Sequence, residues 1–226
     1  MLCGQQHSPQ NQQHCGVDEA GGTGGGFSPE PDRIHLSNGT LFLDGTFVEG
    51  KPKIVRNRFP AAYNPNAPKP DLWLQFLDGL LYPEDIPTLQ EYIGYCLIPS
   101  NKGQRMMMIK GNGGEGKSQI GAVLGTLFGS NMKDGSIGKI IREPVCPCRL
   151  EHILLCVDDD MRMEALRQTN YVKSIVTAQG KMDLERKGKQ SYQGWMCARL
   201  LAWPSPTEIC RRCLTGATDF IAASWC

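Results

Sequence analysis

The chain has 226 residues, enough for one well-packed core or for a core with a small accessory segment. With 24 Lys and Arg residues against 23 Asp and Glu residues, the net charge is +1, so the whole molecule has no bias toward polyanions. No apolar stretch approaches the roughly 20 residues of a membrane span, and the N-terminus lacks the features of a signal peptide. We therefore expect a soluble, cytoplasmic protein with no membrane partner.

The N-terminal part changes character at Ile34. Residues 1–33 are rich in Gln, Gly and Pro and hold almost no apolar side chains, which predicts a disordered segment. Over 34–48, apolar residues are interrupted by Asn-Gly and Asp-Gly pairs. This pattern is typical of short strands joined by tight turns.

A proline-rich linker follows over 60–70. The spacing of apolar residues then predicts two amphipathic helices, over 71–81 and 86–97. We expect residues 34–100 to form an accessory β and helical segment that braces a core beginning at 101.

The most specific motif is an eight-residue string that matches G-x-x-x-x-G-K-S at every fixed position. It lies between an apolar run suited to a buried strand, 106–109, and apolar residues typical of a packed helix, 120–128. In such a loop, backbone N–H groups close around phosphate oxygens, and the following helix adds its positive end. We therefore predict that the chain binds ATP through Gly111, Asn112, Gly113, Gly114, Glu115, Gly116, Lys117 and Ser118.

A second apolar run, 153–157, ends in three consecutive aspartates. In a site of this kind the lysine of the loop reaches the β- and γ-phosphates and the serine hydroxyl holds Mg²⁺. One carboxylate orients the metal through its water shell, and the next polarises the attacking water. We assign Lys117 and Asp159 as catalytic, Ser118 and Asp158 as metal-binding, and Asp160 as the alternate carboxylate.

Basic residues gather in the last third of the chain. After a helical pattern over 161–177, residues 181–192 predict a hairpin whose tip carries Arg186, Lys187 and Lys189. Such side chains would meet the phosphates of single-stranded DNA without reading its bases. An ordinary solvated hairpin is the alternative, and charge alone does not decide between them.

In order and spacing, the phosphate loop, the aspartate run about forty residues later and the basic hairpin resemble the superfamily 3 helicases. The resemblance is strongest to the helicase half of phage and plasmid primase–helicases and their poxvirus-type relatives, and it extends over 34–202. It implies an α/β fold, with a P-loop NTPase core of AAA+-like, three-layer form. It further implies a bacterial or phage-encoded ATPase that assembles as a hexameric ring around DNA, with Lys187 and Lys189 in the channel.

The chain departs from the family's pattern in two places. Residues 200–202 begin a strand that in this family ends in a sensor Asn, with an arginine soon afterwards, but residues 203–226 show neither. A shift of the reading frame by one base restores a family-like segment there, and a second shift does so within 142–149. We therefore hypothesise a core truncated to 101–202 and an out-of-frame tail in which Trp203 has no designed pocket.

The ten cysteines at first suggest a zinc site, at Cys146-x-Cys148 and Cys210-x-x-Cys213. The first spacing is tight for zinc, and the only nearby histidine, His152, lies on a probable strand. Five of the cysteines also lie in the two frame-disturbed segments, so we expect no zinc.

Three functions remain open from the sequence. The first is an ATP-dependent DNA helicase domain of a phage or prophage replication protein, impaired in this chain. The second is a P-loop kinase, which should show a basic lid and an acceptor pocket. The third is a non-enzymatic remnant that binds nucleotide or DNA. The aspartate run directly after a strand and the basic hairpin favour the helicase.

Overall fold

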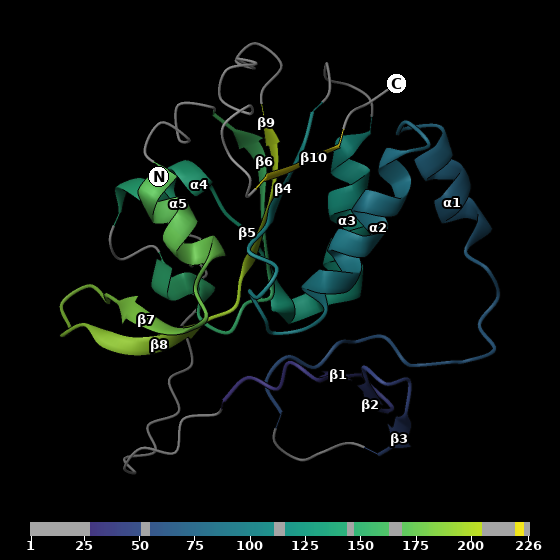
Figure 1. The fold of residues 1–226 in the computed structure, drawn as a ribbon, viewed down its shortest axis with the longest axis horizontal. Helices are drawn as coiled ribbons and strands as arrows, with labels where there is room; N and C mark the ends of the chain where they lie inside the picture. The colour runs from purple at the N-terminus through teal and green to yellow at the C-terminus, as the bar shows by residue number, and fades with distance from the viewer. Residues whose placement is uncertain are drawn as a thin grey trace, which may run out of the picture.

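The computed structural model describes residues 28–50, 55–110, 116–143, 147–162, 169–204 and 220–223. Within these ranges, a central sheet carries helices on both of its faces, and two smaller β units lie outside it (Figure 1). Most of the predicted disordered segment lies outside the described residues, as do the first five residues of the phosphate loop.

The N-terminal β unit is a three-stranded antiparallel sheet. Its strands are β1 (Arg33–His35), β2 (Gly39–Phe42) and β3 (Phe47–Glu49). This arrangement confirms the prediction of short strands joined by turns. Gly39 is required there, because a Cβ atom at this position would lie 2.4 Å from the backbone oxygen of Val48.

Two helices follow the linker, as predicted: the first ends three residues earlier than expected, and the second is shifted by one residue. Helix α1 (Asp71–Asp78) ends at Gly79, and helix α2 (Asp85–Cys96) begins after Pro83 and Glu84. Both helices bury leucines, Leu77 and Leu89, in a shared apolar cluster with the central sheet.

In the described part of the chain, the central sheet has five strands in the order β10-β4-β9-β6-β5, and every neighbouring pair is parallel. A parallel sheet with helices on both faces confirms the predicted α/β fold class. The strands are β4 (Met106–Ile109), β5 (Met132–Asp134), β6 (Leu155–Met161), β9 (Arg199–Pro204) and β10 (Phe220–Ala223).

Alternating residues of these strands enter two separate apolar clusters. Met107 and Val157 pack on one face with α2 and with α3 (Lys117–Phe128). Met108 and Cys156 pack on the other face with α4 (Ile137–Arg142) and α5 (Thr169–Val176). The period of two along each strand therefore produces the three layers seen in Figure 1. Short 3₁₀ turns complete the helical elements at Gly129–Asn131 and Pro147–Leu150.

The end of the chain differs from expectation in two respects. Strand β10 belongs to the segment assigned to an out-of-frame tail, yet it lies at the sheet edge beside β4. Trp203, expected to lack a pocket, is only 3% exposed and packs in the cluster that contains Leu201 and Val157.

The region around β6 also differs from the sequence prediction. His152 is not on a strand: it lies in a turn, with φ +64°, and β6 begins only at Leu155. The strand then continues through the aspartates to Met161, so that residue 161 is not helical. Helix α5 begins at Thr169, and residues 163–168 lie outside the described ranges.

Candidate functional site

The strands that carry the two predicted motifs end at the same edge of the sheet. Strands β4 and β6 are both parallel to β9, which lies between them. Met108 on β4 and Asp158 on β6 both pair with Ala202 on β9. Because neighbouring strands lie about 4.8 Å apart, Met108 and Asp158 are level and about 10 Å apart. The end of β4 and the aspartate run therefore lie at the same edge of the sheet.

Only the last three residues of the predicted phosphate loop are described, and they form the start of α3. Gly116 precedes the helix with φ +94°, a left-handed conformation that favours glycine. Helix α3 begins at Lys117, of which only the backbone is described, and the side chain of Ser118 in the first turn is exposed. The predicted residues Gly111, Asn112, Gly113, Gly114 and Glu115 lie outside the described ranges.

Asp158 has a structural task that the sequence did not predict. Its side chain is only 4% exposed, and its Oδ2 accepts a 2.6 Å hydrogen bond from the backbone N–H of Ile137, the first residue of α4. Its Oδ1 accepts a longer bond, 3.3 Å, from the backbone N–H of Asp160. Burial raises the pKa of Asp158 above its usual value, and these two hydrogen bonds oppose that rise. Both oxygens of the predicted metal ligand are thus already engaged.

Asp159 and Asp160, by contrast, are exposed. They lie where the pairing of β6 with β9 becomes irregular, between Asp158 and Met161. Exposed carboxylates and the exposed Ser118 hydroxyl at one sheet edge are hard oxygen donors, which suit Mg²⁺ held together with phosphate and water. Within the described ranges, no group of three or more His, Cys, Asp or Glu side chains could hold a metal alone.

The basic hairpin is present, as β7 (Gly180–Leu184) and β8 (Tyr192–Met196). It lies at the end of the sheet opposite the carboxyl ends of the strands (Figure 1). Leu184, beside the turn, and Met196, at the base, lie on its inner face and are buried against the cluster of α4 and α5. The two strands are therefore anchored along their inner face, and the turn that joins them is exposed.

Arg186 makes interactions within the protein, whereas the two tip lysines are exposed. Its Nη2 lies 3.1 Å from the Glu151 Oε2, its Nε donates to the Tyr192 hydroxyl, and its guanidinium lies 4.4 Å from the centre of the Tyr192 ring. The Tyr192 hydroxyl donates to the same Glu151 oxygen at 2.6 Å. Lys187 and Lys189 are fully on the surface. No pattern in the sequence indicated Glu151, which holds Arg186 from 35 residues away.

A buried arginine joins the hairpin to the helical layer. Arg199, at the start of β9, is only 1% exposed, and its guanidinium donates to the carbonyls of Cys96, Ser100 and Cys197 at 2.6, 3.1 and 2.7 Å. Asn101 donates from Nδ2 to the carbonyls of Ile175 and Met196. The only sequence signal for this connection was a charged residue at the start of an otherwise apolar strand.

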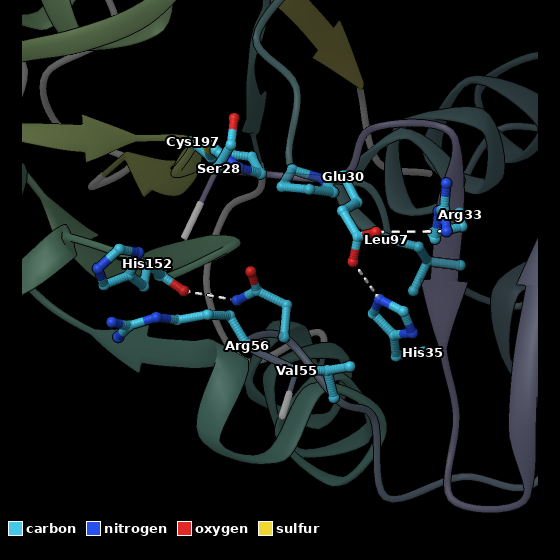
Figure 2. A pocket seen from close by; sticks show the side chains of 12 residues that line it. Ser28, Glu30, Arg33, His35, Val55, Arg56, Leu97, His152 and Cys197 are labelled. Carbon is cyan, nitrogen blue, oxygen red and sulfur yellow. Dashed lines mark hydrogen bonds and ion pairs between the residues drawn. The ribbon is translucent and has the colours of Figure 1, made fainter. Parts of the chain in front are cut away.

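A small cavity lies between the N-terminal β unit and the core. Figure 2 shows Glu30 between Arg33 and His35, with its carboxylate 3.3 Å from the Arg33 Nη1 and 2.9 Å from the His35 Nε2. Asn57 donates a 2.6 Å hydrogen bond to the carbonyl of His152, which ties this region to the core. The cavity of about 50 Å³ is too small for a nucleotide, so these contacts serve attachment.

Comparison with known proteins supports the fold class. A family described as "Family of unknown function (DUF5906)" matches residues 109–204, and no curated protein matches. Two apo structures of the NrS-1 C-terminal region are similar, with TM-scores of 0.55 and 0.59 at 15% and 12% identity. The first match covers 88% of this chain and 46% of that one, and the second covers 87% and 45%. The chain thus spans about half the length of these structures.

A JCV helicase structure also matches, with 16% identity over 67% of this chain and 43% of that one. Its TM-score of 0.45 is too low to carry an argument. At the identities of all these matches, the similarity establishes the fold and no activity. Separately, no described helix is both long enough and apolar enough to span a membrane.

Proposed function

We propose that this chain is the ATPase core of a helicase-type motor, which binds ATP with Mg²⁺ and acts on DNA. The main supporting observation is that Met108 on β4 and Asp158 on β6 pair with the same residue of β9, Ala202, from its two sides. It places the end of β4 and the aspartate run at the carboxyl edge of one parallel sheet, which is where ligands of α/β sheets bind.

The residues of this edge divide the chemistry among them. Backbone N–H groups of 111–116 and the Lys117 ammonium would hold the triphosphate, and Ser118 would hold Mg²⁺. The metal would neutralise charge on the phosphates. Because both oxygens of Asp158 accept backbone hydrogen bonds, Asp159 is the available carboxylate, with Asp160 beside it. We propose that Asp159 polarises the attacking water. Asp158 supports the start of α4 and would contact the metal only through a bound water.

The DNA partner is proposed from the hairpin at the opposite end of the sheet. Lys187 and Lys189 are exposed and would meet phosphates of a single strand. Arg186 is held by Glu151 and Tyr192, so we give it a supporting role. Assembly as a hexameric ring and membership of the superfamily 3 helicases of phage replication proteins belong to the same proposal.

We further propose that turnover in this chain is weak. Residues 203–226 lack the sensor Asn and the trans-acting arginine expected from the resemblance, and the family match ends at residue 204. Loss of such an arginine costs about 10³–10⁵ in rate in related phosphoryl-transfer systems. ATP binding should therefore survive better than hydrolysis.

Two measurements test the proposal. Calorimetry with ATP and Mg²⁺ should show binding to the folded chain, and Lys117→Ala should abolish it. Asp159→Asn should leave binding within a few fold but remove residual hydrolysis. A folded chain that ignores ATP–Mg²⁺ would overturn the proposed function.

The DNA partner needs its own charge-matched control. The double change Lys187→Glu and Lys189→Glu should weaken binding of a single-stranded oligonucleotide and flatten its salt dependence. The double change Lys69→Glu and Lys173→Glu alters net charge equally at exposed positions outside the hairpin. Equal losses in the two variants would show that the hairpin is not the contact.

A further inference from the structure

A second cavity, of about 270 Å³, lies at the base of the hairpin. Three segments that are distant in sequence meet around it: 100–102 before β4, 178–180 at the start of β7, and 195–197 at the end of β8. Ser28, Pro29 and Pro31 close one side. Because this volume is below the roughly 300–1,000 Å³ of pockets for drug-sized ligands, it suits one small flat group and not a whole nucleoside triphosphate.

The cavity has an aromatic wall. Trp195 lies on the outer face of the hairpin, opposite Lys181 in the β7–β8 pairing, and it is partly exposed. The Lys181 ammonium lies 5.7 Å from the centre of the indole ring. An aromatic surface beside a cation is the combination that proteins use to stack and hold the bases of a single strand.

Further positive charge surrounds the opening. Lys102 lines the cavity. Both Lys102 and Lys181 are exposed. Lys187 and Lys189 continue the positive charge along the hairpin to its tip. Two acids also lie along this path: Asp183, on the same outer face, whose carboxylate accepts a hydrogen bond from Gln193, and the exposed Glu185 directly after β7. The lysines are therefore positioned to follow a phosphate backbone from the tip to the cavity.

Hydrogen bonds hold the walls of the cavity in place. The Asn101 amide donates to the Ile175 carbonyl at 3.1 Å and to the Met196 carbonyl at 3.3 Å. Arg199 fixes the same segment through the Ser100 carbonyl and the Cys197 carbonyl. A cavity fixed in this way needs little reorganisation on binding, which favours affinity.

We propose that this cavity receives an unstacked base of single-stranded DNA, which stacks on Trp195 while Lys102 and Lys181 contact the flanking phosphates. The proposal rests on the proposed DNA partner. It adds, to the phosphate contacts at the hairpin tip, a contact with a nucleobase at the opposite end of the hairpin. Stacking tolerates any base, so little sequence preference is expected.

The test compares a labelled oligo-dT with an oligonucleotide of equal length and charge in which every position is abasic. Full-length protein should bind oligo-dT more tightly than the abasic strand. Trp195→Ala should weaken oligo-dT binding about 5- to 100-fold and leave abasic binding unchanged, whereas Trp195→Phe should retain most of the affinity. Tyr82 is an exposed aromatic residue outside the cavity, so Tyr82→Ala should leave the affinity for both strands unchanged.

Each other outcome has a definite meaning. Equal binding of both strands by the unaltered protein overturns the base contact but leaves the DNA partner intact. A loss in Trp195→Ala that is the same for both strands, or that Trp195→Phe shares in full, assigns Trp195 a structural role and also overturns the proposal. Binding of neither strand overturns the DNA partner itself, while ATP binding is judged separately through Lys117→Ala. Thermal melting of each variant controls for folding.

Discussion

The carboxylate of Asp158 accepts a 2.6 Å hydrogen bond from the backbone N–H of Ile137 and so joins the end of β6 to the start of α4. An acceptor at a helix N-terminus satisfies an N–H group that the helix itself cannot pair. The aspartate run is therefore part of the fold as well as part of the proposed nucleotide site.

The burial of Asp158 predicts a pH-dependent effect of Asp158→Asn. The folded-state pKa is raised, so the folded protein binds this proton more tightly than the unfolded chain does. Protonated Asp158 therefore makes its full contribution to the free energy of unfolding below the pKa of the unfolded state. This contribution is lost as the pH rises through the pKa of the folded state. Asparagine keeps an oxygen for Ile137 and carries no charge. Asp158→Asn should thus gain stability over the unaltered protein at pH 7, and the gain should disappear in acid.

Urea unfolding at several pH values would measure this difference. Asp159→Asn is the matched control, because Asp159 is exposed and should show no comparable trend. A lower stability of Asp158→Asn at neutral pH would contradict the prediction.

Replacing Arg199 should destabilise the protein. Arg199→Met would leave the carbonyls of Cys96 and Cys197 without their donor inside the core, at a cost of about 1–3 kcal/mol. Arg199→Lys should recover only part of the lost stability, because an ammonium group lacks the planar, forked set of donors of the guanidinium. Arg142→Met, an exposed change in the last turn of α4, should alter the free energy of unfolding by less than about 0.5 kcal/mol. Equal effects at the two positions would show that the Arg199 contacts contribute little.

Two glycine-to-alanine changes should have opposite signs. A Cβ atom on Gly194 would lie 2.4 Å from the Leu184 Cδ1 and 2.8 Å from the Glu151 Oε1, so Gly194→Ala should cost about 1–3 kcal/mol. A Cβ atom on Gly125, inside α3, meets nothing within 4 Å, so Gly125→Ala should add about 0.5–1 kcal/mol. Chemical denaturation measures both values. A stabilising Gly194→Ala would show that the hairpin does not pack as described.

The contacts among Glu151, Arg186 and Tyr192 predict coupled energies. Tyr192→Phe and Glu151→Gln each weaken the 2.6 Å hydrogen bond between these side chains. The two changes together should therefore cost less than the sum of the single changes, with a coupling of at least about 0.5 kcal/mol. A double-mutant cycle measures the coupling. Strict additivity would mean that the tyrosine and the carboxylate do not stabilise the hairpin jointly.

Local patterns in the sequence predicted the elements well. The apolar run that became β4, the apolar residues of α3 and the turn pairs of the N-terminal β unit each depend on neighbouring residues alone. Their existence and type followed from periodicity and turn chemistry.

What the sequence could not predict depends on distant contacts. Asp158 is buried because α4, which starts 21 residues earlier in the chain, packs beside it. Arg199 is buried because the end of α2 lies 103 residues away in sequence and yet within hydrogen-bonding distance. A charged side chain looks the same in the sequence whether it is solvated or paired, so the hydrogen bonds of Asp158 and Arg186 within the protein could not be predicted.

The connection between the hairpin and the sheet has a mechanical consequence. Only Cys197 and Ala198 separate β8 from β9, and β9 lies between β4 and β6. Both linking residues are buried. A displacement of the hairpin would therefore be passed directly to β9, which lies between β4, the strand before the predicted phosphate loop, and β6, which carries the aspartates.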